Sequence, residues 1–128
     1  MSAIPSIMSL HLRYRLLIAE LNADINVLRI FEDYIQELKS LKAEQEVKSG
    51  IDLYNKQFQQ ARKEIDDLRH EMHMVKMQLG EYSREKKKID LKSKLNRDRI
   101  ALKKRYIEFR KFFEKSKKEF GKFEAKWL

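Results

Sequence analysis

The sequence contains no cysteine, one proline and three glycines among its 128 residues. Without cysteine the chain can form no disulfide and can use no thiolate for catalysis or metal binding. With so few helix-breaking residues there is little material for loops, and no segment shows the alternating pattern of a β-strand. The composition is instead typical of long helices and coiled coils, which are rich in Glu, Lys, Leu and Arg.

Long apolar runs are missing as well. Uncharged apolar stretches such as residues 16–19 are far shorter than the roughly 20 residues that cross a bilayer. The N-terminus also lacks the basic region and the small-residue cleavage site of a secretory signal. We therefore expect a cytoplasmic protein.

Apolar side chains recur at alternating steps of three and four residues from position 51 to position 89, and only Lys86 interrupts the series. Side chains three and four apart share one helix face, so a repeat of this length predicts a helix that packs lengthwise against another helix. The apolar positions of the series are Ile51, Tyr54, Phe58, Ala61, Ile65, Leu68, Met72, Val75, Leu79, Tyr82 and Ile89.

A first helix is predicted over about residues 6–47, since Pro5 suits the first turn of a helix. Gly50 tolerates the left-handed conformation that ends helices, so the turn is predicted at residues 48–50. A turn this short makes the second helix antiparallel to the first. The first helix carries apolar residues on two neighbouring faces, which indicates more than one packing partner.

The last third of the chain allows two arrangements. A second, offset heptad series consists of Tyr106, Phe109, Phe113, Ser116, Phe120, Phe123 and Trp127. Ile89, Ile100 and Ile107 continue the earlier frame while Leu91, Leu95 and Leu102 begin the later one, as in a stutter within one continuous helix.

We favour an all-α, single-domain fold over residues 1–128: a long antiparallel helical hairpin, or coiled coil, with an extended C-terminal helix over about 51–126. In this arrangement the aromatic end is buried in a homodimer. The alternative is a three-helix bundle, in which the chain turns near residues 80–83, with Gly80 ending one helix and Ser83 starting the next.

The net charge of +9 is unevenly distributed. Residues 83–128 contain 18 Lys and Arg against 7 Asp and Glu, a net charge of +11, whereas the two preceding parts are each close to neutral. Such asymmetry predicts an interaction with an anionic partner. The candidate residues for this surface are Lys86, Lys87, Lys88, Lys103, Lys104, Arg105, Arg110, Lys111, Lys117 and Lys118.

Seven of the chain's aromatic residues lie among these basic residues. Lysine with aromatic side chains is typical of nucleic-acid binding, and an anionic membrane surface could accept the same helix. The heptad spacing of Tyr106, Phe109, Phe113, Phe120, Phe123 and Trp127 favours instead a helix-packing or oligomerisation stripe. Phe112 lies off this stripe, so among the aromatic residues it is the one that we expect to contact a partner.

Other candidate chemistry is weak. Asp66, Asp67, His70 and His73 have the helical spacing of some di-iron ligands, but a real site needs carboxylates from further helices. A helical hairpin also lacks the concave pocket that catalysis usually needs. We expect no enzyme activity, no metal, no cofactor and no small-molecule substrate.

In outline, a basic antiparallel helical hairpin of this length resembles the coiled-coil stalk proteins of the flagellar and type III secretion export apparatus. The resemblance covers architecture alone and transfers no residue. The sequence thus predicts a structural or adaptor protein that forms a homodimer and presents a basic surface to an acidic protein partner. Binding of nucleic acid or of an anionic membrane is the alternative.

Overall fold

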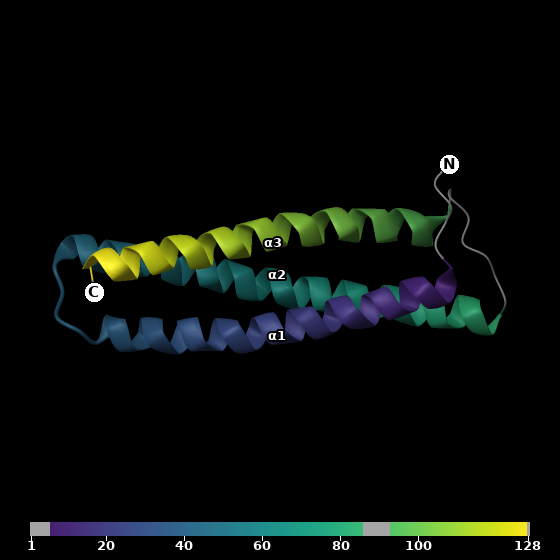
Figure 1. The fold of residues 1–128 in the computed structure, drawn as a ribbon, viewed down its shortest axis with the longest axis horizontal. Coiled ribbons are helices and arrows are strands. Elements are labelled where there is room, and N and C mark those ends of the chain that lie inside the picture. Colours follow the sequence, from purple (N-terminus) through teal and green to yellow (C-terminus); the bar gives the residue numbers. More distant parts are fainter. Residues whose placement is uncertain (1–5, 86–92, 128) are drawn as a thin grey trace.

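The computed structural model describes residues 6–85 and 93–127, and these residues form three α-helices and no strand. The helices are α1 (Ile7–Lys39), α2 (Gln45–Arg84) and α3 (Lys94–Trp127). Consecutive helices run antiparallel, and α2 packs against both α1 and α3 (Figure 1). The predicted all-α class is confirmed, in the form of the three-helix alternative.

The turn between α1 and α2 lies at residues 40–44 and not, as predicted, at residues 48–50. α1 ends at Lys39 and is followed by the C-cap residue Ser40, whose hydroxyl donates a 2.7 Å hydrogen bond to the carbonyl oxygen of Glu37. α2 begins before Val47 because this side chain, four residues ahead of Ile51, already belongs to the buried face of α2. The apolar series of the second helix therefore starts one step earlier than predicted.

Gly50 lies inside α2 and does not end a helix. A Cβ atom at this position would overlap the ring of Phe123, which packs directly on the α2 backbone. The Phe123 ring is held there by Tyr54 and Phe120, with ring centroids 5.4 and 6.3 Å away. The absence of a side chain at Gly50 thus allows Phe123 of α3 to pack closely on α2.

The helix predicted over 51–126 is two helices in the structure. α2 continues through Gly80 and ends at Arg84, a little beyond the break predicted at residues 80–83. At the start of α3, the Ser93 hydroxyl accepts a 3.1 Å hydrogen bond from the backbone N–H of Asn96, as an N-cap does.

The core follows the inward face of α2 along its length. This face consists of the predicted heptad series from Ile51 to Tyr82 with Val47 added, whereas Ile89 and Leu91 lie outside the described residues. Its buried members are Val47, Ile51, Phe58, Ala61, Ile65, Leu68, Met72, Val75 and Leu79. On α3, Leu95 and Leu102 are buried, whereas Ile100 and Ile107 are exposed. The later of the two apolar frames is therefore the one that faces the core.

α1 and α3 contact each other only through side chains. Among the described residues, no Cα atom of α1 lies within 8 Å of one in α3. Large rings fill the space at one end: Phe120 of α3 packs against Phe31 of α1 and Phe58 of α2, with centroids 5.7 and 5.6 Å away. Further along the bundle, charged side chains connect α1 and α3 in one place, and a cavity lies between the two helices in another.

Candidate interaction surfaces

α3 presents a row of lysines on its outer face. We call this row the lysine ridge; it consists of Lys111, Lys115, Lys118, Lys122 and Lys126, all exposed. Steps of four, three, four and four residues place them on one side of the helix. Lys111, Lys118 and Lys122 form no ion pair with any described residue.

Acidic side chains of the same part of α3 are engaged elsewhere. The Glu124 carboxylate accepts a 3.3 Å hydrogen bond from the hydroxyl of Tyr34 on α1. Glu114 binds Lys117 Nζ at 2.9 Å, and this hydrogen bond holds the pKa of Glu114 below its usual range. Only Glu119 approaches the ridge, at 3.8 Å from Lys115. The outer face of α3 therefore keeps a strong positive charge.

The predicted basic cluster at residues 103–105 does not form one surface. Lys103 and Lys104 are both exposed, but only Lys103 lines a cavity between α1 and α3, and Arg105 pairs with Glu64 of α2 at 3.1 Å. The cluster separates because successive residues of a helix point about 100° apart. The predicted cluster of Lys86, Lys87 and Lys88 lies outside the described residues.

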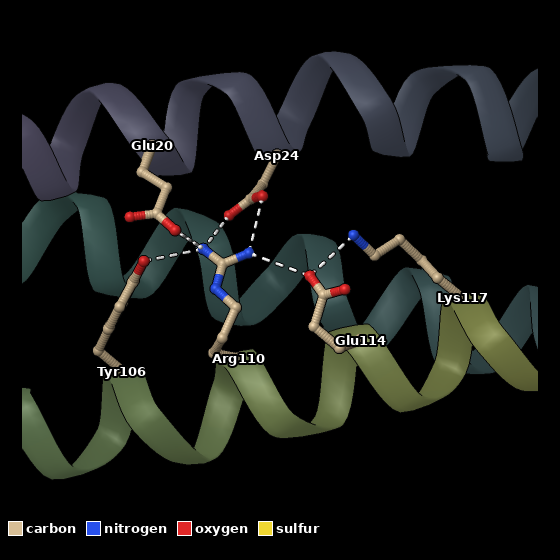
Figure 2. A network of polar contacts seen from close by, with 6 residues as sticks. All are labelled: Glu20, Asp24, Tyr106, Arg110, Glu114 and Lys117. Carbon is tan, nitrogen blue, oxygen red and sulfur yellow. Dashed lines mark hydrogen bonds and ion pairs between the residues drawn. The ribbon is translucent and has the colours of Figure 1, made fainter.

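Arg110 is an internal residue that ties α3 to α1 (Figure 2). Its guanidinium donates two hydrogen bonds to the Asp24 carboxylate, at 2.9 and 2.6 Å, and one of 2.9 Å to the hydroxyl of Tyr106. Glu20 and Glu114 lie at 3.1 and 3.6 Å from the same group. A planar guanidinium suits this arrangement because it can bind a carboxylate through two parallel hydrogen bonds.

The charges of this network stabilise one another. The hydrogen bonds to Asp24 raise the pKa of Arg110 above its usual value, against the opposing effect of burial. Burial, reinforced by the Glu20 carboxylate, raises the pKa of Tyr106 to about 12. The side chain of Asp24 is only 10% exposed and that of Arg110 24%. Arg110 is therefore committed to the fold rather than to an external anion.

Lys117 is also held by its own helix. Its side chain is 24% exposed, and Nζ lies 4.5 Å from the centroid of the Phe113 ring as well as beside Glu114. Of the seven described residues predicted to form the anionic-partner surface, Lys104, Lys111 and Lys118 are left on the outer face of α3. Lys122 and Lys126 were not predicted because they lie outside the clusters of closely spaced basic residues.

Most of the predicted aromatic stripe packs within the chain's own bundle. Phe109, Phe113 and Phe120 are buried, Tyr106 and Phe123 are half-buried, and Trp127 is 40% exposed. Phe112, singled out as a contact residue, is half-buried against the core. These rings hold α3 to α1 and α2, so a surface for self-association has to be sought on another part of the molecule.

α1 carries an apolar stripe on the face that points away from the core. We call it the α1 outer stripe; its members, spaced by three or four residues, are Met8, Leu12, Leu16, Ala19, Ala23, Val27 and Ile30. All are exposed, with Met8, Leu16 and Ile30 exposed by 78%, 62% and 69%. Val27 and Ile30 belong to the second of the two apolar faces predicted for the first helix, whereas the N-terminal part of the stripe was not predicted.

The remaining predicted candidates contribute no site in the described residues. Asp66, Asp67, His70 and His73 are all exposed on α2, and Asp66 pairs with Arg69 at 3.5 Å. Within residues 6–85 and 93–127 there is no group of three His, Cys, Asp or Glu side chains that could hold a metal ion. In the same part of the chain, no helix has the length and apolarity needed to cross a membrane.

Two surfaces therefore stand out, the lysine ridge of α3 and the α1 outer stripe. Both are formed by side chains spaced by three and four residues along one helix. No family model, curated protein or solved structure matches this chain, so its function is inferred from its own geometry.

Proposed function

We propose that this chain is a non-enzymatic adaptor that self-associates and presents the lysine ridge to an acidic protein partner. The observation that carries the proposal is the distribution of charge on α3, where lysines occupy the outer face while Glu114 and Glu124 bind other groups of the bundle. Excess positive charge on a rigid helix attracts and orients a negatively charged surface.

The spacing of the ridge fits an acidic helix. Neighbouring lysines stand about one helical turn apart, roughly 5.4 Å along the axis, over a length of about 22 Å between Lys111 and Lys126. A partner helix with carboxylates at the same steps of three and four has the same repeat. Each lysine can then meet one carboxylate without either helix bending.

The other anionic partners suit this surface less well. Single-stranded nucleic acid is bound through stacking on accessible aromatic rings, and Phe109, Phe113 and Phe120 are buried. Binding along a membrane surface requires a free apolar helix face, which α3 uses for its own core. Duplex nucleic acid needs only lysines beside phosphates, so it is the competing ligand in the test below.

The test uses a synthetic helical peptide with glutamates on one face at steps of three and four. A peptide of the same composition with glutamates around the whole helix is the control. We expect the first peptide to bind more tightly, and we expect the variant K111Q/K115Q/K118Q/K122Q to lose this binding. The variant K39Q/K42Q/K48Q/K56Q removes the same charge from exposed positions elsewhere and should bind as the wild type does.

Equal losses in the two quadruple variants would mean that net charge alone attracts the peptide, which would refute the ridge as the site. Tighter binding of a short DNA duplex than of either peptide, with affinity falling steeply as salt rises, would replace the acidic protein by nucleic acid.

For self-association, the proposal assigns the α1 outer stripe to a second copy of the chain. From Met8 to Ile30 the stripe extends about 33 Å, and an apolar surface of this length in contact with water is typical of an interface. Ala19 and Ala23 lie near its middle, with larger apolar residues on both sides. Two antiparallel copies related by a two-fold axis near residue 21 would bring small residues together where the backbones are closest.

Sedimentation analysis of point variants tests this interface. Leu16→Glu and Ile30→Glu introduce charges at exposed positions, so the fold should persist while the dimer dissociates. Leu53→Glu is the matched control, because Leu53 is an equally apolar residue of α2, 51% exposed and outside the stripe. A wild-type chain that sediments as a monomer at all concentrations would exclude self-association, and dissociation by the Leu53 variant alone would place the interface on α2.

A further inference from the structure

A cavity of about 250 Å³ opens between α1 and α3, with α2 as its floor. It lies where the backbones of α1 and α3 stay apart and where the described residues form no set of packed rings like that around Phe120. Its buried wall is formed by Leu10, Tyr14 and Met72, which are 0%, 3% and 0% exposed. The sequence predicted a long hairpin without a concave site, whereas three packed helices enclose one.

The mouth of the cavity carries three cations, Arg13, Arg99 and Lys103, and none of the described residues that line it is acidic. Arg13 and Lys103 form no ion pair with any described residue. Arg99 donates hydrogen bonds of 3.3 and 2.7 Å to the amide oxygen of Asn96, which is uncharged. Three positive charges beside an apolar space repel one another unless an anion lies among them.

Tyr14 adds a neutral hydrogen-bonding group to the same wall. Its hydroxyl makes no hydrogen bond to any described residue. Burial raises the pKa of Tyr14 to about 12, although Arg99 and Arg13 act in the opposite direction, so the phenol stays protonated at neutral pH. An apolar pocket with a few polar groups near its mouth is the usual form of a small-molecule site between helices of a bundle.

We propose that this cavity binds a single-chain amphiphile with a phosphate monoester head, whose apolar chain enters between α1 and α3 and whose phosphate contacts Arg13, Arg99 and Lys103. A phosphate monoester carries about −1.5 to −2 charges at neutral pH and has three acceptor oxygens, which match three cations better than one carboxylate does. The volume of about 250 Å³ lies below the roughly 300 Å³ at which drug-sized pockets begin, which limits the ligand to a single chain. This site is separate from the lysine ridge and does not depend on the function proposed above.

The probe is dodecyl phosphate, used below the concentration at which it forms micelles, with binding measured by titration calorimetry at physiological salt. Lys103→Gln should weaken binding by about tenfold or more, the effect of losing a hydrogen bond between charged groups. Lys104→Gln is the matched control: it removes the same charge from the next residue, which is exposed and does not line the cavity. Its affinity should equal that of the wild type.

Three further ligands separate the contributions of head and chain. Dodecanoate should bind more weakly than dodecyl phosphate, while dodecanol and inorganic phosphate should not bind measurably. Equal losses for Lys103→Gln and Lys104→Gln would show that the basic surface, not the cavity, attracts the amphiphile and would overturn the proposal. Dodecanol binding as tightly as dodecyl phosphate would overturn it as well, because the cations would then have no role.

A second variant tests the apolar part of the site. Ile107 lines the cavity and is 45% exposed, so Ile107→Trp can extend a large ring across the opening without entering the core. Binding of dodecyl phosphate should be lost while the thermal unfolding temperature stays close to that of the wild type. Unchanged affinity in this variant would mean that the chain does not enter between α1 and α3.

Discussion

Replacing Arg110 by methionine should destabilise the bundle more than replacing its partner Asp24 by leucine. In Arg110→Met, the Asp24 carboxylate loses both of its hydrogen bonds at a site where it is 10% exposed, and Glu20 remains close by. A buried charge left without its partner costs about 3 to 5 kcal/mol, and partial exposure of this network lowers the expectation to about 3 kcal/mol.

The reverse variant leaves Arg110 with other acceptors. In Asp24→Leu, the guanidinium keeps Glu20 at 3.1 Å, Glu114 at 3.6 Å and the Tyr106 hydroxyl at 2.9 Å. We therefore expect a loss of about 1 kcal/mol. The double variant should be more stable than Arg110→Met alone, since removing Asp24 removes the unpaired carboxylate, and apolar pairs often replace buried ion pairs without loss.

Thermal unfolding followed by circular dichroism measures these differences, at one protein concentration because self-association would shift the midpoint. For a chain of this size, 1 kcal/mol corresponds to a change of about 4 °C, so Arg110→Met should melt roughly 12 °C below the wild type. A double variant whose loss equals the sum of the two single losses would show that the two side chains act independently. The assignment of Arg110 as the link between α1 and α3 would then be wrong.

Glycine and tyrosine positions give two further predictions. Gly121→Ala should raise the unfolding midpoint, because no described atom beyond the adjoining backbone of α3 lies within 4 Å of the added methyl group and alanine is favoured in a helix by about 0.5 to 1 kcal/mol. Gly50→Ala should lower it despite the same helical gain, because the methyl group displaces the Phe123 ring; a higher midpoint in both variants would refute this packing. The pKa values of Tyr14 and Tyr106, raised to about 12, exceed the unfolded value of about 10, so their contribution to stability persists below pH 10 and is lost as pH rises through 12. Absorbance titration should show late ionisation of these two side chains, and each Tyr→Phe variant should remove one late step; ionisation of both near pH 10 would contradict their burial.

The helices could be predicted from the sequence, but their ends could not. The apolar series beginning at Ile51 identified the buried face of α2, and its periodicity extends back to Val47, which would have placed the turn correctly. Gly50 was given more weight than this periodicity because glycine commonly ends helices. The structure uses Gly50 for a contact with Phe123, a residue more than 70 positions away, and no local pattern reveals such a contact.

The continuous helix favoured over about residues 51–126 was wrong for a similar reason, whereas the alternative break at residues 80–83 lies close to the end of α2 at Arg84. The shift between the frame of Ile100 and Ile107 and the frame of Leu95 and Leu102 was interpreted as a stutter within one helix. It marks a separate helix, whose core face is formed by the later frame while the earlier frame stays exposed. A change of apolar frame in a segment without proline is compatible with a stutter and with a break between two helices, and only the packing of α3 on α2 distinguishes the two.

Helix geometry also explains why the sequence showed how many basic residues α3 carries but not which of them share a surface. Lys103, Lys104 and Arg105 are adjacent in sequence, yet a helix directs one toward a cavity, one to solvent and one to Glu64 of α2. Adjacent charges therefore say little about a surface on a helix, whereas charges three and four residues apart define one. The lysine ridge satisfies this criterion over four consecutive steps, and it was visible in the sequence without any structure. Binding that follows the ridge and not the adjacent clusters would give this criterion its functional test.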